Sequence, residues 1–167
     1  IRTSPLTRTR QSAEILSQVL GGPPVVEDHD LLEVDFGDWQ GQSFATIRQD
    51  ARFRSFRSAP LSSSPPGARE SMVEVQRRVF RAAERALAEA CGQAVALVSH
   101  GDPVRLILAG CLGLPLGEFR RVRVDNAALS IVELTGDFAE VKLMNLRPDV
   151  AGILGSSIFR PAPDPHV

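Results

Sequence analysis

The sequence predicts an α/β fold, a three-layer α/β/α sandwich with a mainly parallel sheet. Helical and extended segments alternate along most of the chain, which is the pattern of a parallel sheet covered by helices. The apolar run 94–98 shows no alternation of polar and apolar residues, so we expect a strand that is buried on both faces. With 167 residues, of which 43% are apolar, the chain is long enough for one domain with a substantial core.

The first half of the chain predicts a helix, a strand, an irregular loop and a second helix. The first helix begins at Ser4-Pro5, where a serine can cap it and a proline suits its first turn, and it ends at Gly21-Gly22. Val25-Val26 is a short strand, and the glycines of 31–41 indicate irregular backbone. The helix expected at 44–57 mixes arginines with phenylalanines, which fits either a solvated basic face with aromatic anchors or a rim that recruits anionic substrate.

The second half predicts a long helix, a central strand and a third helix. Glu70 to Cys91 has an apolar face at helical spacing, and 94–99 is the buried strand. Asp102 can cap the helix that follows, and Pro103 suits its first position, so we expect this helix to run from Pro103 to about Leu112.

The end of the chain predicts a hairpin and then a tail. Residues 129–134 and 139–144 read as two strands joined by a turn, so one edge of the sheet is expected to be antiparallel. Prolines recur in 148–167, which we interpret as an irregular tail. The predicted domain is therefore 1–147.

Charge and cysteine content narrow the class of protein. A formal net charge of −1 gives no general case for binding nucleic acid or an acidic membrane surface. Cys91 and Cys111 lack the spacing of a metal site or a disulfide framework, which favours a reducing cytoplasm. No apolar stretch reaches the about 18 residues of a membrane span. We therefore expect a cytoplasmic protein without nucleic-acid or membrane partners.

Three residues are candidates for a phosphate site. Arg8 lies near the start of the first helix, and His100 follows the buried strand at the edge where α/β proteins bind ligands. Arginine and histidine can both donate hydrogen bonds to a phosphate, and Glu33, in a loop bounded by glycines, could donate a proton to a leaving oxygen. Taken singly, each of these residues has a plainer interpretation as a solvated or neighbour-bonded side chain.

Several spaced motifs occur in a fixed order between residue 2 and about residue 135. Ser-x-Leu-x-Arg entering a helix is carried by Ser4, Leu6 and Arg8. Leu-x-Glu-x-x-x-Gly-x-Trp-x-Gly is carried by Leu31, Glu33, Gly37, Trp39 and Gly41. A Gly-Glu-Ser element with a later arginine is approximated by Gly67, Glu70, Ser71 and Arg78, and the last motifs are Val98-Ser99-His100-Gly101 and Asn126. Together they resemble the histidine phosphatase superfamily, also called the phosphoglycerate mutase-like family.

The resemblance implies a site and a reaction. Arg8 and His100 would bind the transferred phosphoryl group together with Gly101, and Glu33 would act as general acid and then as general base. No metal or cofactor is implied. For these roles His100 should be protonated, which phosphate charge encourages, and Glu33 should have a raised pKa, which burial beside Trp39 or Phe36 could provide.

The chain departs from the family pattern at the nucleophile. Family members use the histidine of an Arg-His-Gly motif on their first strand, and neither His29 nor His166 has that context. We therefore expect that the N-terminal strand and helix of the family are missing from this chain and that the chain alone is inactive, whereas the intact protein is a phosphatase. The alternative is a non-catalytic remnant that binds or scaffolds a phosphorylated ligand.

The substrate is predicted only by class. The interval between Glu33 and His100 is shorter than in phosphoglycerate mutases, which favours a phosphomonoesterase, including the α-ribazole phosphatase type, over a mutase. The expected ligand is a small phosphorylated metabolite, and Arg52 or Arg57 is a candidate for selecting a second anionic group. The sequence is compatible with a homodimer and does not determine the oligomeric state.

Overall fold

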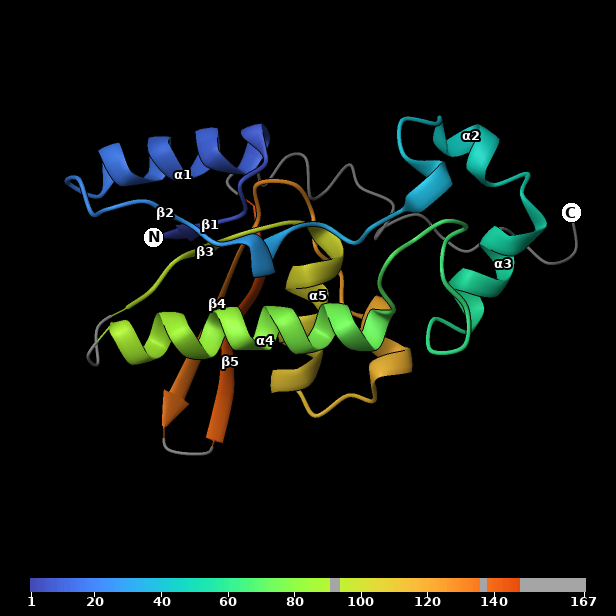
Figure 1. The fold of residues 1–167 in the computed structure, drawn as a ribbon. Helices are drawn as coiled ribbons and strands as arrows, with labels where there is room; N and C mark the ends of the chain where they lie inside the picture. The colour runs from blue at the N-terminus through green and yellow to red at the C-terminus, as the bar shows by residue number, and fades with distance from the viewer. Residues whose placement is uncertain (91–93, 136–137, 148–167) are drawn as a thin grey trace, which may run out of the picture.

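The computed structural model describes residues 1–90, 94–135 and 138–147 and arranges them as an α/β fold. The elements in chain order are β1 (Arg2–Thr3), α1 (Thr7–Val19), β2 (Val26–Glu27), η1 (His29–Leu31), η2 (Gly37–Trp39), α2 (Phe44–Ile47), α3 (Ala51–Ser58), α4 (Met72–Glu89), β3 (Leu97–Val98), α5 (Gly101–Cys111), η3 (Leu116–Arg121), β4 (Leu129–Thr135) and β5 (Phe138–Leu146). Figure 1 shows α1 on one side of the β1–β3 sheet and α4 and α5 on the other. The predicted α/β sandwich with a mainly parallel sheet is confirmed.

The parallel sheet has three strands in the order β2-β1-β3. Arg2 pairs with Val26 and Leu97, and Thr3 pairs with Glu27 and Val98. The prediction that 94–99 is the central strand was wrong within this sheet, because β1 takes the centre and β3 lies at its edge with half-buried side chains. The two residues of β1 are too few to show a sequence pattern.

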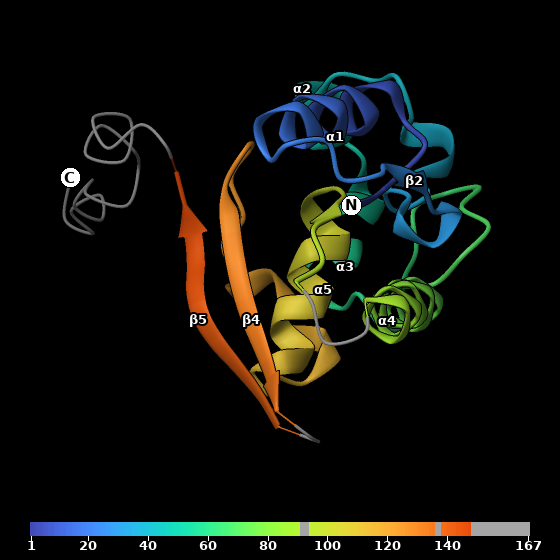
Figure 2. The same ribbon diagram turned by 90° about the vertical axis from the view of Figure 1, so that its left-hand side faces the viewer.

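The predicted hairpin is confirmed, and it forms a separate two-stranded sheet. β4 and β5 pair antiparallel, and Figure 2 shows them standing beside the parallel sheet with α5 between the hairpin and α4. Val132 and Val141 pack against the core, whereas alternate residues such as Ile131 and Met144 are exposed. This alternation is typical of an antiparallel sheet with one covered face.

The first helix begins at Thr7, two residues later than Ser4 and Pro5 predict. Ser4 continues the pairing of β1, since its amide donates to the carbonyl of Val98 at 3.0 Å. Its hydroxyl lies 2.8 Å from Nε2 of His100 and also accepts from the amide of Leu6 at 3.4 Å. Thr9 closes the turn by donating to the carbonyls of Ser4 and Leu6. Ser4 is thus buried at the end of a strand and is not the N-cap that the sequence predicts for α1.

The long helix α4 begins one residue after Ser71, which forms a capping box with Glu74. Val75 and Val79, on the buried side of this helix, pack into the core and are completely inaccessible to solvent. The prediction of a helix from Glu70 to Cys91 is confirmed except at its ends, and Cys91 lies outside the described residues.

Helix α5 begins earlier than predicted and without the expected cap. Its N-cap is His100, and the side chain of that residue makes no capping hydrogen bond. Asp102 lies in the first turn, where its carboxylate accepts from Nη1 of Arg105 at 2.7 Å, so the prediction of Asp102 as the cap was wrong. Pro103 is the third residue of α5 rather than the first, a position that also needs no intrahelical N–H bond.

The segment predicted as one helix at 44–57 is divided into α2 and α3. Asp50 makes the division, because it caps α3 and also accepts a 3.0 Å hydrogen bond from the indole of Trp39. Phe53 and Phe56 pack edge-to-face on Trp39 with ring centroids 5.8 Å apart. The expected aromatic anchors are confirmed for Phe53 and Phe56, whereas Phe44 is exposed.

The sequence of the tail, 148–167, lies outside the described residues. Among the residues that the structure describes, no helix has the length and apolar character needed to cross a membrane.

A substitution at Gly37 tests how closely the glycine-rich loop is packed. A Cβ added at Gly37 would lie 2.1 Å from the carbonyl oxygen of Pro66, and its φ of +50° is left-handed. We expect Gly37→Ala to lower the free energy of unfolding by about 1–2 kcal/mol for the backbone and ~1–3 kcal/mol more for the collision. Gly41→Ala is the matched control, since its φ is +75° but nothing lies within 4 Å. Equal losses in urea denaturation would contradict the close approach.

Candidate active site

His100 stands where β3 ends and α5 begins, and it is buried. Its Nδ1 lies 2.8 Å from Nη2 of Arg8, and its Nε2 lies 2.8 Å from the hydroxyl of Ser4. A guanidinium can only donate, so Nδ1 must be the acceptor and Nε2 must carry the proton that is donated to Ser4. The hydrogen-bond network therefore assigns a neutral imidazole with its proton on Nε2.

Arg8 reaches His100 from the first turn of α1. Because β1 and β3 are parallel neighbours, the helices that follow them both begin at the same edge of the sheet. Arg8 is otherwise exposed, so its side chain closes one side of the buried histidine while remaining accessible from solvent. The structure thus brings together two of the three candidate phosphate ligands.

Without a bound anion, the surroundings of His100 disfavour its protonated form. Burial, together with the positive charges of Arg8 and Arg78, lowers the pKa of His100 to about 4. Near neutral pH the ring is therefore uncharged until an anion enters. A bound phosphate would oppose both causes, because its negative charge stabilises an imidazolium.

The pKa of Glu33 is displaced in the opposite direction, upward. Burial raises the pKa of Glu33 to about 6, and the nearby Asp102 carboxylate acts in the same direction. The amide of Val34, which donates to Glu33 Oε1 at 3.0 Å, and the charges of Arg8 and Arg105 oppose the rise in pKa. The raised pKa that the sequence required of Glu33 is present, and the carboxyl is close enough to Arg8 to be influenced by its charge.

Gly101 supplies the first amide of α5. A Cβ at this position would meet Nη1 of Arg105 at 3.3 Å, so the glycine leaves room for the guanidinium beside the helix N-terminus. Amides at a helix N-terminus attract anions, which is consistent with the predicted role of Gly101 in phosphate binding.

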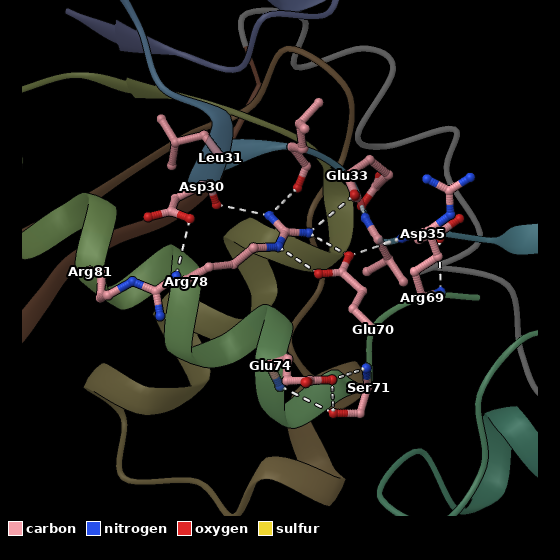
Figure 3. A network of polar contacts seen from close by, with 12 residues as sticks. Asp30, Leu31, Glu33, Asp35, Arg69, Glu70, Ser71, Glu74, Arg78 and Arg81 are labelled. Atoms are coloured by element: carbon pink, nitrogen blue, oxygen red, sulfur yellow. Dashed lines mark hydrogen bonds and ion pairs between the residues drawn. The ribbon is translucent and has the colours of Figure 1, made fainter.

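The loop that carries Glu33 is held by a partly buried ion pair. Figure 3 shows the guanidinium of Arg78, from α4, pointing at the backbone of residues 30–33 while Glu70 accepts from it on the other side. Its Nε and Nη2 each lie 2.8 Å from an oxygen of Glu70. Sequence analysis included Glu70 and Arg78 in a motif but gave them no function.

Two other residues of the site were missed by sequence analysis. Ser4 was interpreted as a helix cap, and Asp102 likewise, whereas Ser4 binds His100 and Asp102 acts on the pKa of Glu33. The signal for Ser4 was its place in the Ser-x-Leu-x-Arg motif. Nothing local in the sequence distinguishes a capping serine from one that bonds a distant histidine.

The arginine-rich segment holds a surface groove lined by Arg48, Phe53, Arg54 and Arg57, among others. Arg52, one of the two candidates for selecting a second anionic group, binds Asp50 through Nη2 at 2.7 Å. Arg57 lies over the ring of Phe53 and faces the groove. Arg52 is thus paired with a carboxylate, whereas Arg57 borders the groove.

Among the described residues, no second histidine ring joins His100 in the site. His29 is exposed in η1, and His166 lies outside the described residues. Across residues 1–90, 94–135 and 138–147, no group of three histidine, cysteine, aspartate or glutamate side chains is arranged to hold a metal ion.

Curated relatives match most of this chain but have additional sequence. The bifunctional protein Rv2228c of Mycobacterium tuberculosis is 37% identical over 145 residues, covering 86% of this chain and 39% of the relative. A probable phosphoglycerate mutase GpmB of Klebsiella pneumoniae is 32% identical over 136 residues, covering 80% of this chain and 62% of the relative. The chain therefore spans less than two thirds of the length of either relative.

Solved structures with the same fold include phosphatases. YhfR of Bacillus stearothermophilus gives a TM-score of 0.77 at 27% identity, covering 85% of this chain and 71% of that one. A mycobacterial glucosyl-3-phosphoglycerate phosphatase gives 0.74 at 26% identity, covering 86% and 76%. A putative α-ribazole-5′-phosphate phosphatase of Escherichia coli gives 0.73 at 25% identity, covering 87% and 72%.

The family model named histidine phosphatase superfamily (branch 1) matches residues 1–147. This range contains Arg8, Glu33 and His100 and every element of the structure from β1 to β5. The chain belongs to the histidine phosphatase superfamily.

Proposed function

We propose that this chain provides the phosphate-binding and proton-donating residues of a metal-independent phosphomonoesterase. The observation that carries the proposal is the 2.8 Å contact between Arg8 and His100, and the charge of the same arginine acts on the pKa of Glu33. Fixed cationic donors in a partly dry site favour the charge that develops during phosphoryl transfer. The relatives support the general class, because those with a named activity are phosphatases or a probable mutase.

Phosphate entry would rearrange the contact between Arg8 and His100. A phosphate oxygen replaces His100 Nδ1 as the acceptor for Arg8, and Nδ1 takes up a proton and donates to the phosphate. Both residues then donate to the anion instead of one donating to the other. Binding is therefore expected to be accompanied by proton uptake at neutral pH, since His100 starts as a neutral ring.

Glu33 is proposed as the proton donor to the leaving oxygen. As the ester P–O bond breaks, the oxygen that departs takes the proton of Glu33, and the phosphoryl group passes to a histidine nitrogen. The Glu33 carboxylate then accepts a proton from the water that attacks phosphorus, which releases phosphate and restores the free histidine. The pKa of about 6 suits a group that both gives and takes a proton near neutrality.

The nucleophile is proposed to lie in an Arg-His-Gly segment outside these 167 residues. The chain has three histidines, and the sequence around each differs from that motif. This observation also favours the alternative, a protein that binds a phosphorylated ligand through Arg8 and His100 and does not transfer the phosphoryl group.

The proposed substrate is a small phosphorylated metabolite. Phosphatases of glucosyl-3-phosphoglycerate and α-ribazole 5′-phosphate are among the structural relatives, and both named substrates are phosphate monoesters of small molecules. Arg57 is the proposed contact for a second anionic group, because it borders the groove beside α3.

A substitution of Arg8 tests the phosphate site. We expect Arg8→Gln to weaken binding of inorganic phosphate about 10- to 100-fold, because a hydrogen bond to a charged group is lost. Arg10→Gln is the control, since Arg10 lies on the same helix and pairs with Glu27 at 3.4 Å. Nitrogen NMR of His100 at pH 6 should show the ring becoming protonated as phosphate is added, and an unchanged ring would contradict the proposed exchange.

The raised pKa of Glu33 can be tested by the pH dependence of the free energy of unfolding. Its pKa rises from an ordinary 4.5 to about 6 in the folded protein, so its contribution to stability is complete below pH 4.5 and is lost as the pH rises to 6. Glu33→Gln mimics the protonated form. We take the free energy of unfolding of the variant minus that of the native protein. This difference should rise by about 1–2 kcal/mol between pH 4 and pH 7. A difference that does not depend on pH would mean that Glu33 titrates normally.

The nucleophile is tested by labelling. We expect residues 1–167 alone to form no acid-labile phosphohistidine with a phosphorylated substrate and to hydrolyse it negligibly. The full-length protein should form the phosphohistidine, detected by radiolabel that survives base and is lost in acid. Acid-labile label on the 167-residue chain would overturn the assignment, and phosphate binding without label on the full-length protein would support the non-catalytic alternative.

A further inference from the structure

Arg78 uses every donor of its guanidinium, and most of them go to the loop that carries Glu33. Nη1 donates to the carbonyls of Asp30 and Leu32 at 2.8 and 2.7 Å, and Nη2 donates to the carbonyl of Glu33 at 3.1 Å. The other two N–H groups, on Nε and Nη2, go to the carboxylate of Glu70. Because a guanidinium has five N–H groups in a rigid plane, these five contacts leave it no freedom to turn.

Glu70 joins Arg78 to the next part of the same loop. Its Oε1 accepts from Arg78 and also from the amide of Asp35 at 3.1 Å. The pair is mostly shielded from solvent, since the side chains of Arg78 and Glu70 are 12% and 20% exposed. The loop is therefore held on both sides of Glu33, at residues 30–33 by Arg78 and at Asp35 by Glu70.

Ser99 makes the connection to the histidine. Its hydroxyl donates to the carbonyl of Leu31 at 2.7 Å, and it directly precedes His100. The carbonyls of residues 30, 31, 32 and 33 thus all accept from side chains, three bonds coming from α4 and one from the end of β3. Glu33 and His100 are fixed to a shared frame although no hydrogen bond joins their side chains.

We propose that Arg78 is a positioning residue, which holds the Glu33 backbone so that the carboxyl reaches the leaving oxygen of a phosphate bound at Arg8 and His100. This inference rests on the proposed role of Glu33 as proton donor. It differs from a purely structural role, because loss of the clamp should damage protonation of the leaving group more than phosphate binding.

Arg78→Lys is the test, carried out in the full-length protein. Lysine keeps the charge but cannot span Glu70 and three carbonyls in one plane. We expect the single-turnover rate of alcohol release from an alkyl phosphate to fall about 10²-fold, the size expected when a catalytic group is displaced by about 1 Å. The rate with p-nitrophenyl phosphate should fall much less, because its leaving group needs little protonation, and KM should change little.

Arg77→Lys is the matched control. Arg77 is the preceding residue on α4, is exposed, and has no contact with the loop among the described hydrogen bonds. This variant should leave both rates unchanged. An equal loss on alkyl and aryl phosphates in Arg78→Lys would overturn the positioning role.

A double substitution separates failure of this inference from failure of the proposed function. In Glu33→Gln the selective loss on alkyl phosphates should already be present, and adding Arg78→Lys should lower the rate less than threefold further, since the two residues act as one unit. If Glu33→Gln shows no selectivity for the leaving group, the role of Glu33 is wrong. If Glu33→Gln shows it and Arg78→Lys does not, only the positioning role is wrong.

Ser99→Ala provides a second variant if Arg78→Lys does not fold. It removes one hydroxyl from the clamp and leaves the ion pair in place. A smaller loss with the same preference for aryl phosphates would support the inference. A variant that is fully active, or equally impaired on both substrate classes, would contradict it.

Discussion

The parallel pairing of β1 with β3 is the constraint on which the site depends. Thr3 pairs with Val98, and the amide of Ser4 donates to the carbonyl of the same Val98, so the residues that follow both strands emerge together. Ser4 and His100 consequently meet across the end of the sheet at 2.8 Å, and α1 presents Arg8 to the other ring nitrogen. A shift of register by one residue would turn these side chains to opposite faces and separate them.

The electrostatics of the site prepare it for an anion. Burial displaces the pKa of His100 downward and the pKa of Glu33 upward, because in each case the charged form is disfavoured. A phosphate bound at the proposed site would add negative charge near both groups, which would favour the protonated form of each. The same binding event would therefore convert His100 into a donor and keep Glu33 in its acidic form, which are the two states that phosphoryl transfer requires.

Much of the fold could be predicted from the sequence, but its start could not. The long helix α4 and the β4–β5 hairpin follow from periodicity and turn residues, whereas β1 has only two residues and acquires its central place through its neighbours. Ser4 and Asp102 have typical capping residue types, yet both serve long-range or side-chain partners instead. For Ser4, local preference is overruled by a contact with His100 that forms only once the sheet has assembled, whereas Asp102 pairs with Arg105 inside the same helix.

The candidate site shows the same division between local and distant signals. Arg8, Glu33 and His100 stand in short motifs, but the function of Arg78 depends on carbonyls 45 to 48 residues away along the chain. Residues 30–33 contain little regular structure, so their carbonyls need partners from elsewhere, and unpaired buried carbonyls would be costly. Side chains from α4 and β3 meet that need and, by doing so, determine where Glu33 lies. The arginine that meets the backbone requirement of an irregular loop would, on the proposed role of Glu33, also meet the geometric requirement of proton transfer.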